Sequence, residues 1–166
     1  MRITTISILA LLASQAIGAD QPPIGISPVA LTDSAYVYDT AEQHGIKVTV
    51  LAKGLARSFS MAFLPDGDLL VSERGGQLRV IHDATGAAPE LDPQPVAGMP
   101  QLATPYRNGG LNDLALHPDF AQNHLLYFSY NKPEPGGAER PRSAVALMRG
   151  RYENGRVEDV QELFSS

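Results

Sequence analysis

Residues 107–120 have the sequence RNGGLNDLALHPDF, and the run LLYFSY follows at residues 125–130. The middle of this text repeats an earlier stretch of the chain. Residues 61–66 read MAFLPD and LLVS follows at residues 69–72, whereas the second copy reads LALHPD at 114–119 and LLYFS at 125–129. Placing Ala62 on Ala115 gives a period of 53 residues, from position 62 to position 115. Each copy therefore predicts a strand, a turn and a second strand.

A repeat of roughly 40 to 50 residues with about four strands is typical of a β-propeller blade. From Ile46 onward, short runs of Val, Leu, Phe and Tyr alternate with Gly, Pro, Asp and Asn, which favours an all-β fold, and no stretch shows convincing helical periodicity. We expect strands at residues 47–52, 60–64, 68–73, 77–83, 113–117, 125–131, 144–152 and 159–164. At this period the chain holds about two blades, and a closed propeller needs about 4 to 8. We therefore expect the N-terminal part of a longer propeller.

The predicted organisation has three parts. Residues 1–19 resemble a secretory signal peptide, with Arg2 before a short apolar core and small residues near Ala19. The apolar core is shorter than the roughly 20 residues that a membrane-spanning helix needs, so we expect no stable membrane insertion. Residues 20–45 predict an irregular lead-in, and residues 46–166 the propeller portion. The predicted location is periplasmic or secreted.

Composition excludes several function classes. The chain has no cysteine, so an exported form cannot rely on disulfides. It has 18 acidic and 13 basic residues, and the basic ones are scattered, so nothing indicates a nucleic-acid partner. No Gly-x-Ser-x-Gly elbow and no phosphate-binding loop are present in the sequence, which argues against the common hydrolases and nucleotide enzymes.

Propeller connectivity predicts which loops share a face, because successive strands of a blade are antiparallel. We expect one face of the propeller to carry residues 73–76, 107–110 and 131–137. We expect the opposite face to carry residues 66–67 and 117–124. The first face is the candidate site, since Asn108, Gly109 and Gly110 enter an innermost strand beside the axis. Glycines allow a close approach of backbone to a ligand, and the Asn108 amide carries a donor and an acceptor. A plain glycine turn between blades is the alternative.

The charged residues near this face have modest expected roles. We expect Glu73 and Arg74 to form an ion pair that is either solvated or links two blades. Such a pair contributes about 0 to 1 kcal/mol to the stability of the fold. We expect Lys132, Arg140 and Arg142 on the loop surface.

The four histidines do not indicate a metal site. His117 is expected to have a structural role in the His-Pro-Asp turn, which Asp119 can cap through its own backbone. The other three are His44, His82 and His124, and none of the four pairs with another ligand at metal-binding spacing.

Two stretches of the chain resemble successive blades of the glucose/sorbosone dehydrogenase family. They are FSMAFLPDGDLLVSER at residues 59–74 and the stretch at residues 107–130. The resemblance implies a six-bladed β-propeller that oxidises aldose sugars to lactones by hydride transfer to pyrroloquinoline quinone, with calcium as second cofactor. It places Asn108 where relatives carry a Gln that reaches quinone and sugar, so Asn108, Gly109 and Gly110 are the implied cofactor-binding residues. The family's catalytic histidine is expected beyond Ser166, so the resemblance implies no catalytic or metal-binding residue within this chain. Asn108 in place of Gln is one departure from the family pattern. The dipeptide Ser58-Phe59 is a second, because many relatives have Pro-Trp at this place.

The partners implied by the resemblance are a sugar substrate and an electron acceptor, and a homodimer of the full-length protein is compatible with it. Two alternatives stay open. A propeller that lost its quinone site would act as a binding module, because fold alone does not determine function. A lactone-hydrolysing propeller would need a cluster of calcium-binding carboxylates and Asn side chains around the axis, and the sequence shows no such cluster.

Overall fold

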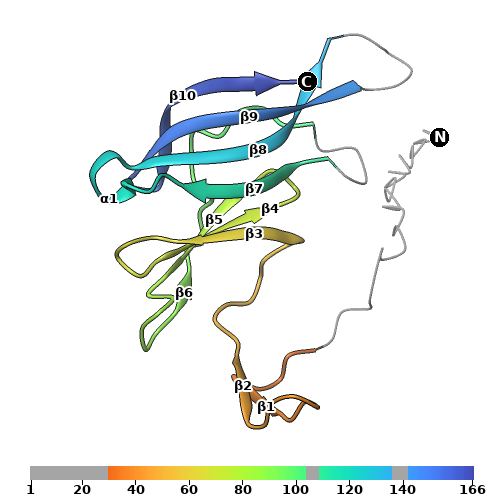
Figure 1. Cartoon of the computed structure of the whole chain (residues 1–166), viewed down its shortest axis with the longest axis vertical. Coiled ribbons are helices and arrows are strands. Elements are labelled where there is room, and N and C mark those ends of the chain that lie inside the picture. The colour runs from red at the N-terminus through yellow and green to blue at the C-terminus, as the bar shows by residue number, and fades with distance from the viewer. Residues whose placement is uncertain (1–29, 104–108, 136–141) are drawn as a thin grey trace, which may run out of the picture. The chain divides into compact units, whose positions relative to one another are not determined.

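The computed structural model describes residues 30–103, 109–135 and 142–166. These residues form antiparallel sheets with one short helix (Figure 1). The elements in chain order are β1 (Ala35–Tyr38), β2 (Ile46–Thr49), β3 (Ser58–Phe63), β4 (Leu69–Glu73), β5 (Leu78–His82), β6 (Glu90–Leu91), β7 (Leu111–Leu116), α1 (Phe120–Asn123), β8 (Leu125–Glu134), β9 (Arg142–Glu153) and β10 (Arg156–Ser165).

Two four-stranded sheets carry the fold. Strands β3, β4, β5 and β6 form one sheet in that order, which we call blade 1, and β7, β8, β9 and β10 form the second, blade 2. Within each blade every strand pairs antiparallel with the next along the chain, as propeller blades do. The first strands of the two blades, β3 and β7, lie next to each other (Figure 1). The predicted all-β propeller architecture is confirmed by this arrangement.

The 53-residue repeat is visible in the strand register. In blade 1, Ser58 lies opposite Glu73 and Met61 opposite Val71, with a register shift between them. In blade 2, Leu111 and Leu114 pair in the same way with β8, with a register shift at the same place. A bulge bends a strand and redirects its side chains, so both first strands turn at equivalent points. The predicted equivalence of the two strands is confirmed.

Backbone hydrogen bonds repeat as well. The Arg74 N–H donates to the Arg57 carbonyl (3.1 Å) in blade 1, and the Asn131 N–H donates to the Gly110 carbonyl (3.0 Å) in blade 2. Arg57 and Gly110 are 53 positions apart, and both have a positive φ. In each blade, a serine of the second strand accepts a hydrogen bond from a backbone N–H at the bulge of the first strand. The donor–acceptor distance is 3.0 Å for Ser72 Oγ and 3.2 Å for Ser129 Oγ. The two blades are therefore built on one local pattern.

One apolar core joins the blades. Strand residues point alternately to the two faces of a sheet, and one face of each blade is apolar. The core contains Leu70, Leu78 and Val80 of blade 1 and Leu126, Phe128 and Ala146 of blade 2. A smaller core on the other face of blade 1 gathers Leu69, Val71, Ile81 and Ala84 beneath residues of the segment that precedes β3. Packing between the blades is thus the main source of stability.

Three short elements differ from the sequence-based expectation. Residues 35–38, within the predicted irregular lead-in, form β1, because the alternating Tyr and Val side chains favour a strand that pairs with β2. Helix α1 was not predicted, because a single turn is too short to show helical periodicity. The two-residue strand β6 was also not predicted. No helix among the described residues is long and apolar enough to span a membrane.

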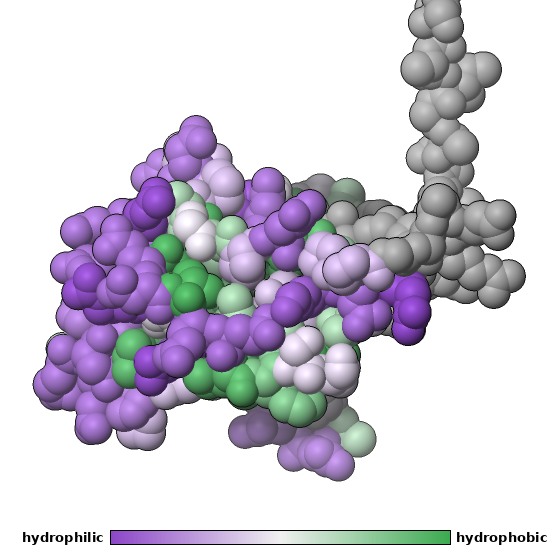
Figure 2. All heavy atoms as spheres, turned by 90° about the horizontal axis from the view of Figure 1, so that it is seen from above, coloured by the Kyte–Doolittle hydropathy of each residue, from purple (hydrophilic) through white to green (hydrophobic). Residues whose placement is uncertain are grey.

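Apolar side chains remain uncovered on the outward sides of both blades. Phe59, Met61 and Phe63 of β3 are 54, 66 and 52% exposed. Seen from the side of β9 and β10, Figure 2 shows hydrophobic groups lying between polar ones. The large exposed hydrophobic residues on those strands are Val145, Leu147, Leu163 and Phe164. In a closed propeller such faces pack against neighbouring blades.

Candidate functional site

The turn before β7 is tightly seated on blade 1. Gly109 and Gly110 are buried, and Gly110 has a φ of +125°. A Cβ atom on Gly110 would lie 1.7 Å from the carbonyl oxygen of Arg74, so no other residue fits here without displacement. The structure therefore gives Gly110 a packing role between the blades. Asn108 lies outside the described residues, and contact of Asn108, Gly109 and Gly110 with a cofactor stays a prediction.

The predicted sharing of faces is confirmed where the structure describes these loops. The Gly110 backbone touches Arg74 at the end of β4 and accepts a hydrogen bond from the Asn131 N–H of β8. The turn at 64–66, helix α1 and the turn at 152–154 line a cavity at the opposite ends of the strands. The face that carries Gly109 and Gly110 is hereafter called the glycine face.

Polar side chains tie β3 to β7 below the glycine face. The Ser60 hydroxyl donates to Asp113 Oδ1 (2.6 Å), and the buried Ser72 hydroxyl donates to the Asn112 carbonyl (2.8 Å). The Leu114 N–H reaches both Ser60 Oγ (3.3 Å) and Asp113 Oδ1 (3.0 Å). These hydrogen bonds fix the position of β7 along β3. They therefore also position the glycine turn that precedes β7. Sequence reasoning missed this link, although Ser60 and Asp113 are 53 residues apart.

An amide pair lies two residues beyond Gly110. Asn112 Nδ2 donates to Asn131 Oδ1 over 3.3 Å. Each amide offers both a donor and an acceptor, which suits recognition of a polar ligand.

The acidic residue at the end of β4 is buried, and the expectation of a solvated or blade-to-blade ion pair is wrong for Glu73. Its side chain accepts a hydrogen bond from the Ala56 N–H and lies 3.8 Å from Arg79 Nη1 within blade 1. Glu73 is only 2% exposed, because the segment before β3 covers this part of the blade. It thus holds that segment on blade 1.

Arg74 points its guanidinium over the Phe59 ring, 5.1 Å from the ring centre, a cation–π arrangement. The Arg74 Nε atom is buried and has no hydrogen-bond partner among the described residues. Arg79 Nε is likewise buried without a partner among the described residues, so this feature does not by itself mark a ligand contact.

Lys132 and Arg142 lie on β8 and β9, which corrects the expected loop position, but their side chains are at the surface as predicted. Lys132 Nζ lies 2.8 Å from Glu162 Oε2, and Arg142 Nε lies 3.6 Å from Glu134 Oε2. Exposed pairs of this kind contribute little to stability, because water and salt screen them. Arg140 lies outside the described residues.

His117 has the structural role in the turn that was expected. Its Nδ1 accepts the Asp119 N–H at 3.0 Å and lies 2.9 Å from Asn123 Nδ2. The expected capping through the Asp119 backbone is confirmed, because the Asp119 carbonyl accepts the Gln122 N–H (2.9 Å) and the Asn123 N–H (3.1 Å). The Asp119 side chain makes no capping bond to α1, and the imidazole of His117 adds a second contact to the turn.

His82 lies between two carboxylates, an arrangement that sequence spacing did not indicate. Its Nδ1 is 2.7 Å from Asp68 Oδ2 and its Nε2 is 3.3 Å from Asp92 Oδ2. The hydrogen bond to Asp68, followed by that to Asp92, raises the pKa of His82 above its usual value. Among the described residues no group of three or more His, Cys, Asp or Glu side chains is arranged to hold a metal ion.

The raised pKa of His82 predicts a pH-dependent stability. A histidine whose pKa rises on folding stabilises the fold fully below its unfolded pKa of about 6.5, and this stabilisation is lost as pH rises through the folded pKa. The side chain is half exposed, so we expect a contribution of no more than about 1 kcal/mol. Urea unfolding of the wild type and His82→Gln at pH 6 and pH 8.5 should show the larger difference at pH 6. An equal difference at both pH values would show that the charge of His82 is irrelevant.

Comparison with known proteins identifies the family. The glucose/sorbosone dehydrogenase family pattern matches residues 55–166. An uncharacterised protein of Synechocystis, slr1608, is 36% identical over 131 residues, covering 75% of this chain and 29% of the relative. The aldose sugar dehydrogenase YliI of Escherichia coli is 32% identical over 120 residues, covering 72% and 30%. This chain thus matches about 30% of the length of these relatives.

Solved structures agree with the sequence match. A crystal structure of a glucose dehydrogenase superposes with a TM-score of 0.59 at 35% identity, over 69% of this chain and 31% of the other. The chain belongs to the glucose/sorbosone dehydrogenase family, and its two sheets are blades of a β-propeller of the glucose dehydrogenase type.

Proposed function

We propose that this chain forms two blades of an exported enzyme that oxidises aldose sugars to lactones with pyrroloquinoline quinone as hydride acceptor. The observation that carries the proposal is the Gly109–Gly110 turn, which enters the innermost strand of blade 2 on the backbone of Arg74. Family membership supports sugar oxidation, and the predicted signal peptide supports a periplasmic or secreted location. An electron acceptor and a homodimer of the full-length form are part of the same proposal.

We propose that the glycine face binds one edge of a planar, anionic cofactor. The Arg74 backbone lies against Gly110, and the Asn112–Asn131 amides lie close to the same turn. Guanidinium groups bind carboxylates well, which suits the carboxylates of the quinone. We assign to Arg74, Gly109, Gly110 and Asn108 the binding and orientation of that edge.

The remaining chemistry needs a proton acceptor at the sugar hydroxyl. When bound, pyrroloquinoline quinone supplies the hydride acceptor and calcium polarises its carbonyl. His124 lines the cavity at the opposite face and His117 caps the turn before α1, so neither is placed to act as a base on the glycine face. We propose that the catalytic base and the calcium ligands come from residues other than those described.

Asn108 is the side chain that we expect to touch the ligand. A hydrogen bond between neutral groups contributes about 0.5 to 1.5 kcal/mol, so Asn108→Ala in the full-length form should lower kcat/KM by about 2- to 10-fold. Asn108→Gln should be tolerated, because relatives carry the longer amide at this place. Steady-state kinetics and thermal unfolding of both variants test this. Unchanged kinetics with a lowered Tm for Asn108→Ala would make the residue a turn-former.

A dye-reduction assay on a form that spans the full length of the relatives tests the proposed function. With added pyrroloquinoline quinone and calcium, we expect turnover of aldose sugars, and none when the quinone is omitted. Binding of sugar without oxidation would favour a binding module in place of an enzyme. Hydrolysis of a lactone without dye reduction would favour a lactonase.

A further inference from the structure

A cleft lies between the blades at the face opposite the glycine face. Its first cavity, of about 340 Å³, is bounded by the turn at 64–66 of blade 1, helix α1 and the turn at 152–154 of blade 2. A second cavity of about 330 Å³ shares Leu64, Asp66, Tyr152 and Asn154 with the first and extends to Asp68, His82 and Asp92. The two cavities form one cleft with Tyr152 at their junction.

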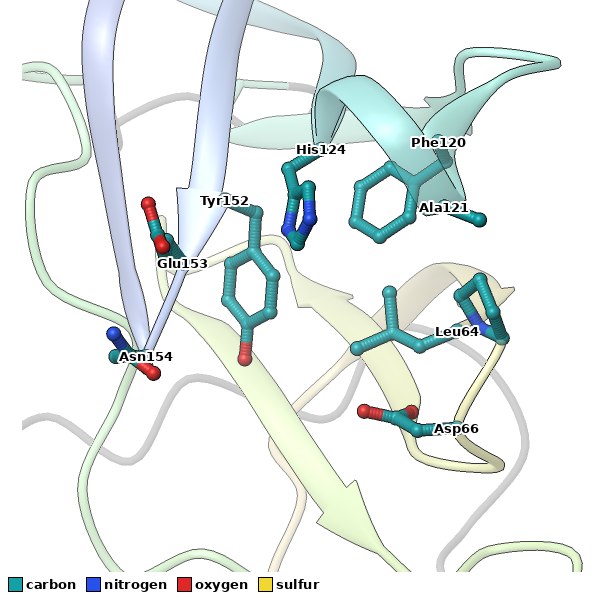
Figure 3. A pocket seen from close by; sticks show the side chains of 9 residues that line it. Leu64, Asp66, Phe120, Ala121, His124, Tyr152, Glu153 and Asn154 are labelled. Carbon is teal, nitrogen blue, oxygen red and sulfur yellow. The ribbon is translucent and has the colours of Figure 1, made fainter.

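One wall of the cleft is aromatic. Figure 3 shows the rings of Tyr152, His124 and Phe120 side by side on blade 2, with Leu64 and Asp66 of blade 1 across from them. The Phe120 and His124 ring centres are 5.7 Å apart, and Phe120 and Leu64 are buried. This wall offers a hydrocarbon chain an apolar surface, and aromatic faces also attract cations.

The other wall is acidic. Asp66 lines both cavities, while Asp68 and Asp92 line the second, where they share the single imidazole of His82. Burial first, then the charges of Asp68, Asp66 and Asp92, raises the pKa of the Tyr152 hydroxyl. All three carboxylates therefore act on the junction of the two cavities. Among the described residues, no Lys or Arg lines either cavity.

We propose that this cleft binds a short aliphatic diamine, with its hydrocarbon chain against Tyr152 and Phe120 and its two ammonium groups at the carboxylates of the two cavities. The cavity and its apolar wall select for a carbon chain, which a bare metal ion lacks. The surplus of carboxylates selects for positive charge, which a sugar lacks. The cleft lies at the strand ends away from Gly110, so the proposal is independent of the oxidation proposed for the glycine face.

Calorimetric titration of the folded full chain at low ionic strength tests the proposal, with butane-1,4-diamine as the probe. Butane-1,4-diol has the same chain length without charge, and Mg²⁺ has the charge without the chain. We expect saturable binding of the diamine that is about tenfold or more tighter than that of either control, a difference of about 1.4 kcal/mol. Shifts of the NMR signals of Leu64 and Tyr152 should accompany it, and well-dispersed spectra establish that the chain is folded.

Two charge-removing variants make the test specific. Asp66→Asn removes a carboxylate that lines both cavities, and we expect about fivefold weaker binding. Glu42→Gln removes the same charge from the exposed turn between β1 and β2 and should leave binding within about twofold of wild type. Tyr152→Phe keeps the ring and should also bind. Absence of saturable binding, equal binding of the diol or Mg²⁺, or equal effects of Asp66→Asn and Glu42→Gln would overturn the proposal.

Discussion

Replacing Gly110 by Ala is expected to destabilise the protein by about 2 to 6 kcal/mol. A non-glycine residue at a φ of +125° carries a backbone strain of about 1 to 3 kcal/mol. The added Cβ would also lie 1.7 Å from the Arg74 carbonyl oxygen, and relief of such overpacking costs about another 1 to 3 kcal/mol. Because the clash is with backbone, a rotated side chain cannot relieve it. Denaturant unfolding, followed by circular dichroism, measures the loss.

Gly155→Ala is the matched control for this prediction. Gly155 has a positive φ of +73°, but a Cβ added there would meet nothing within 4 Å. We expect a cost of about 1 kcal/mol, which is the strain without the overlap. If Gly110→Ala were no more destabilising than Gly155→Ala, the close contact between the Gly109–Gly110 turn and the Arg74 backbone would be contradicted.

Phe128→Ala is expected to cost about 3 to 5 kcal/mol, the usual range for a fully buried aromatic ring. Phe128 is 1% exposed and pairs across strands with Leu114 and Met148 in the core that joins the two blades. Removing its ring would leave a cavity in that core. Thermal and denaturant unfolding of this chain measure the effect.

Phe63→Ala provides the comparison within the same fold. Phe63 lies on β3 but points to the uncovered side of blade 1 and is 52% exposed. Its replacement should cost less than about 1 kcal/mol in this chain, since little apolar surface would be lost from the core. Similar losses for the two variants would mean that the blades do not pack through the core described.

The repeat explains why the blades could be predicted from the sequence. The chain contains two copies of one strand-turn-strand sequence motif, with Ala62 and Ala115 at equivalent positions. These copies specify the first strand of each blade and the loops that share a face. Alternating apolar residues and Gly-containing turns then define most of the other strands. Helix α1 and strand β6 carry no such signal, because four and two residues are too few to repeat a helical period of 3.6 or a strand period of 2.

The site was harder to predict because side-chain partners are not encoded in local spacing. Glu73 looked like a surface acid at the end of a strand, and only the fold reveals the segment that buries it. His82 lies within a strand, and its partners Asp68 and Asp92 come from a turn and from the residues after β6. The Ser60–Asp113 bond could have been found from the repeat, since the two residues occupy the same place in successive blades.

A crystal structure of a full-length form with pyrroloquinoline quinone bound tests the central claim most directly. We expect the quinone on the glycine face, within contact distance of about 4 to 4.5 Å of the turn at residues 108–110 and with Arg74 beside it. Quinone bound at the opposite face, against Leu64 and Tyr152, or at neither face, would contradict the assignment of Asn108, Gly109 and Gly110 to the cofactor.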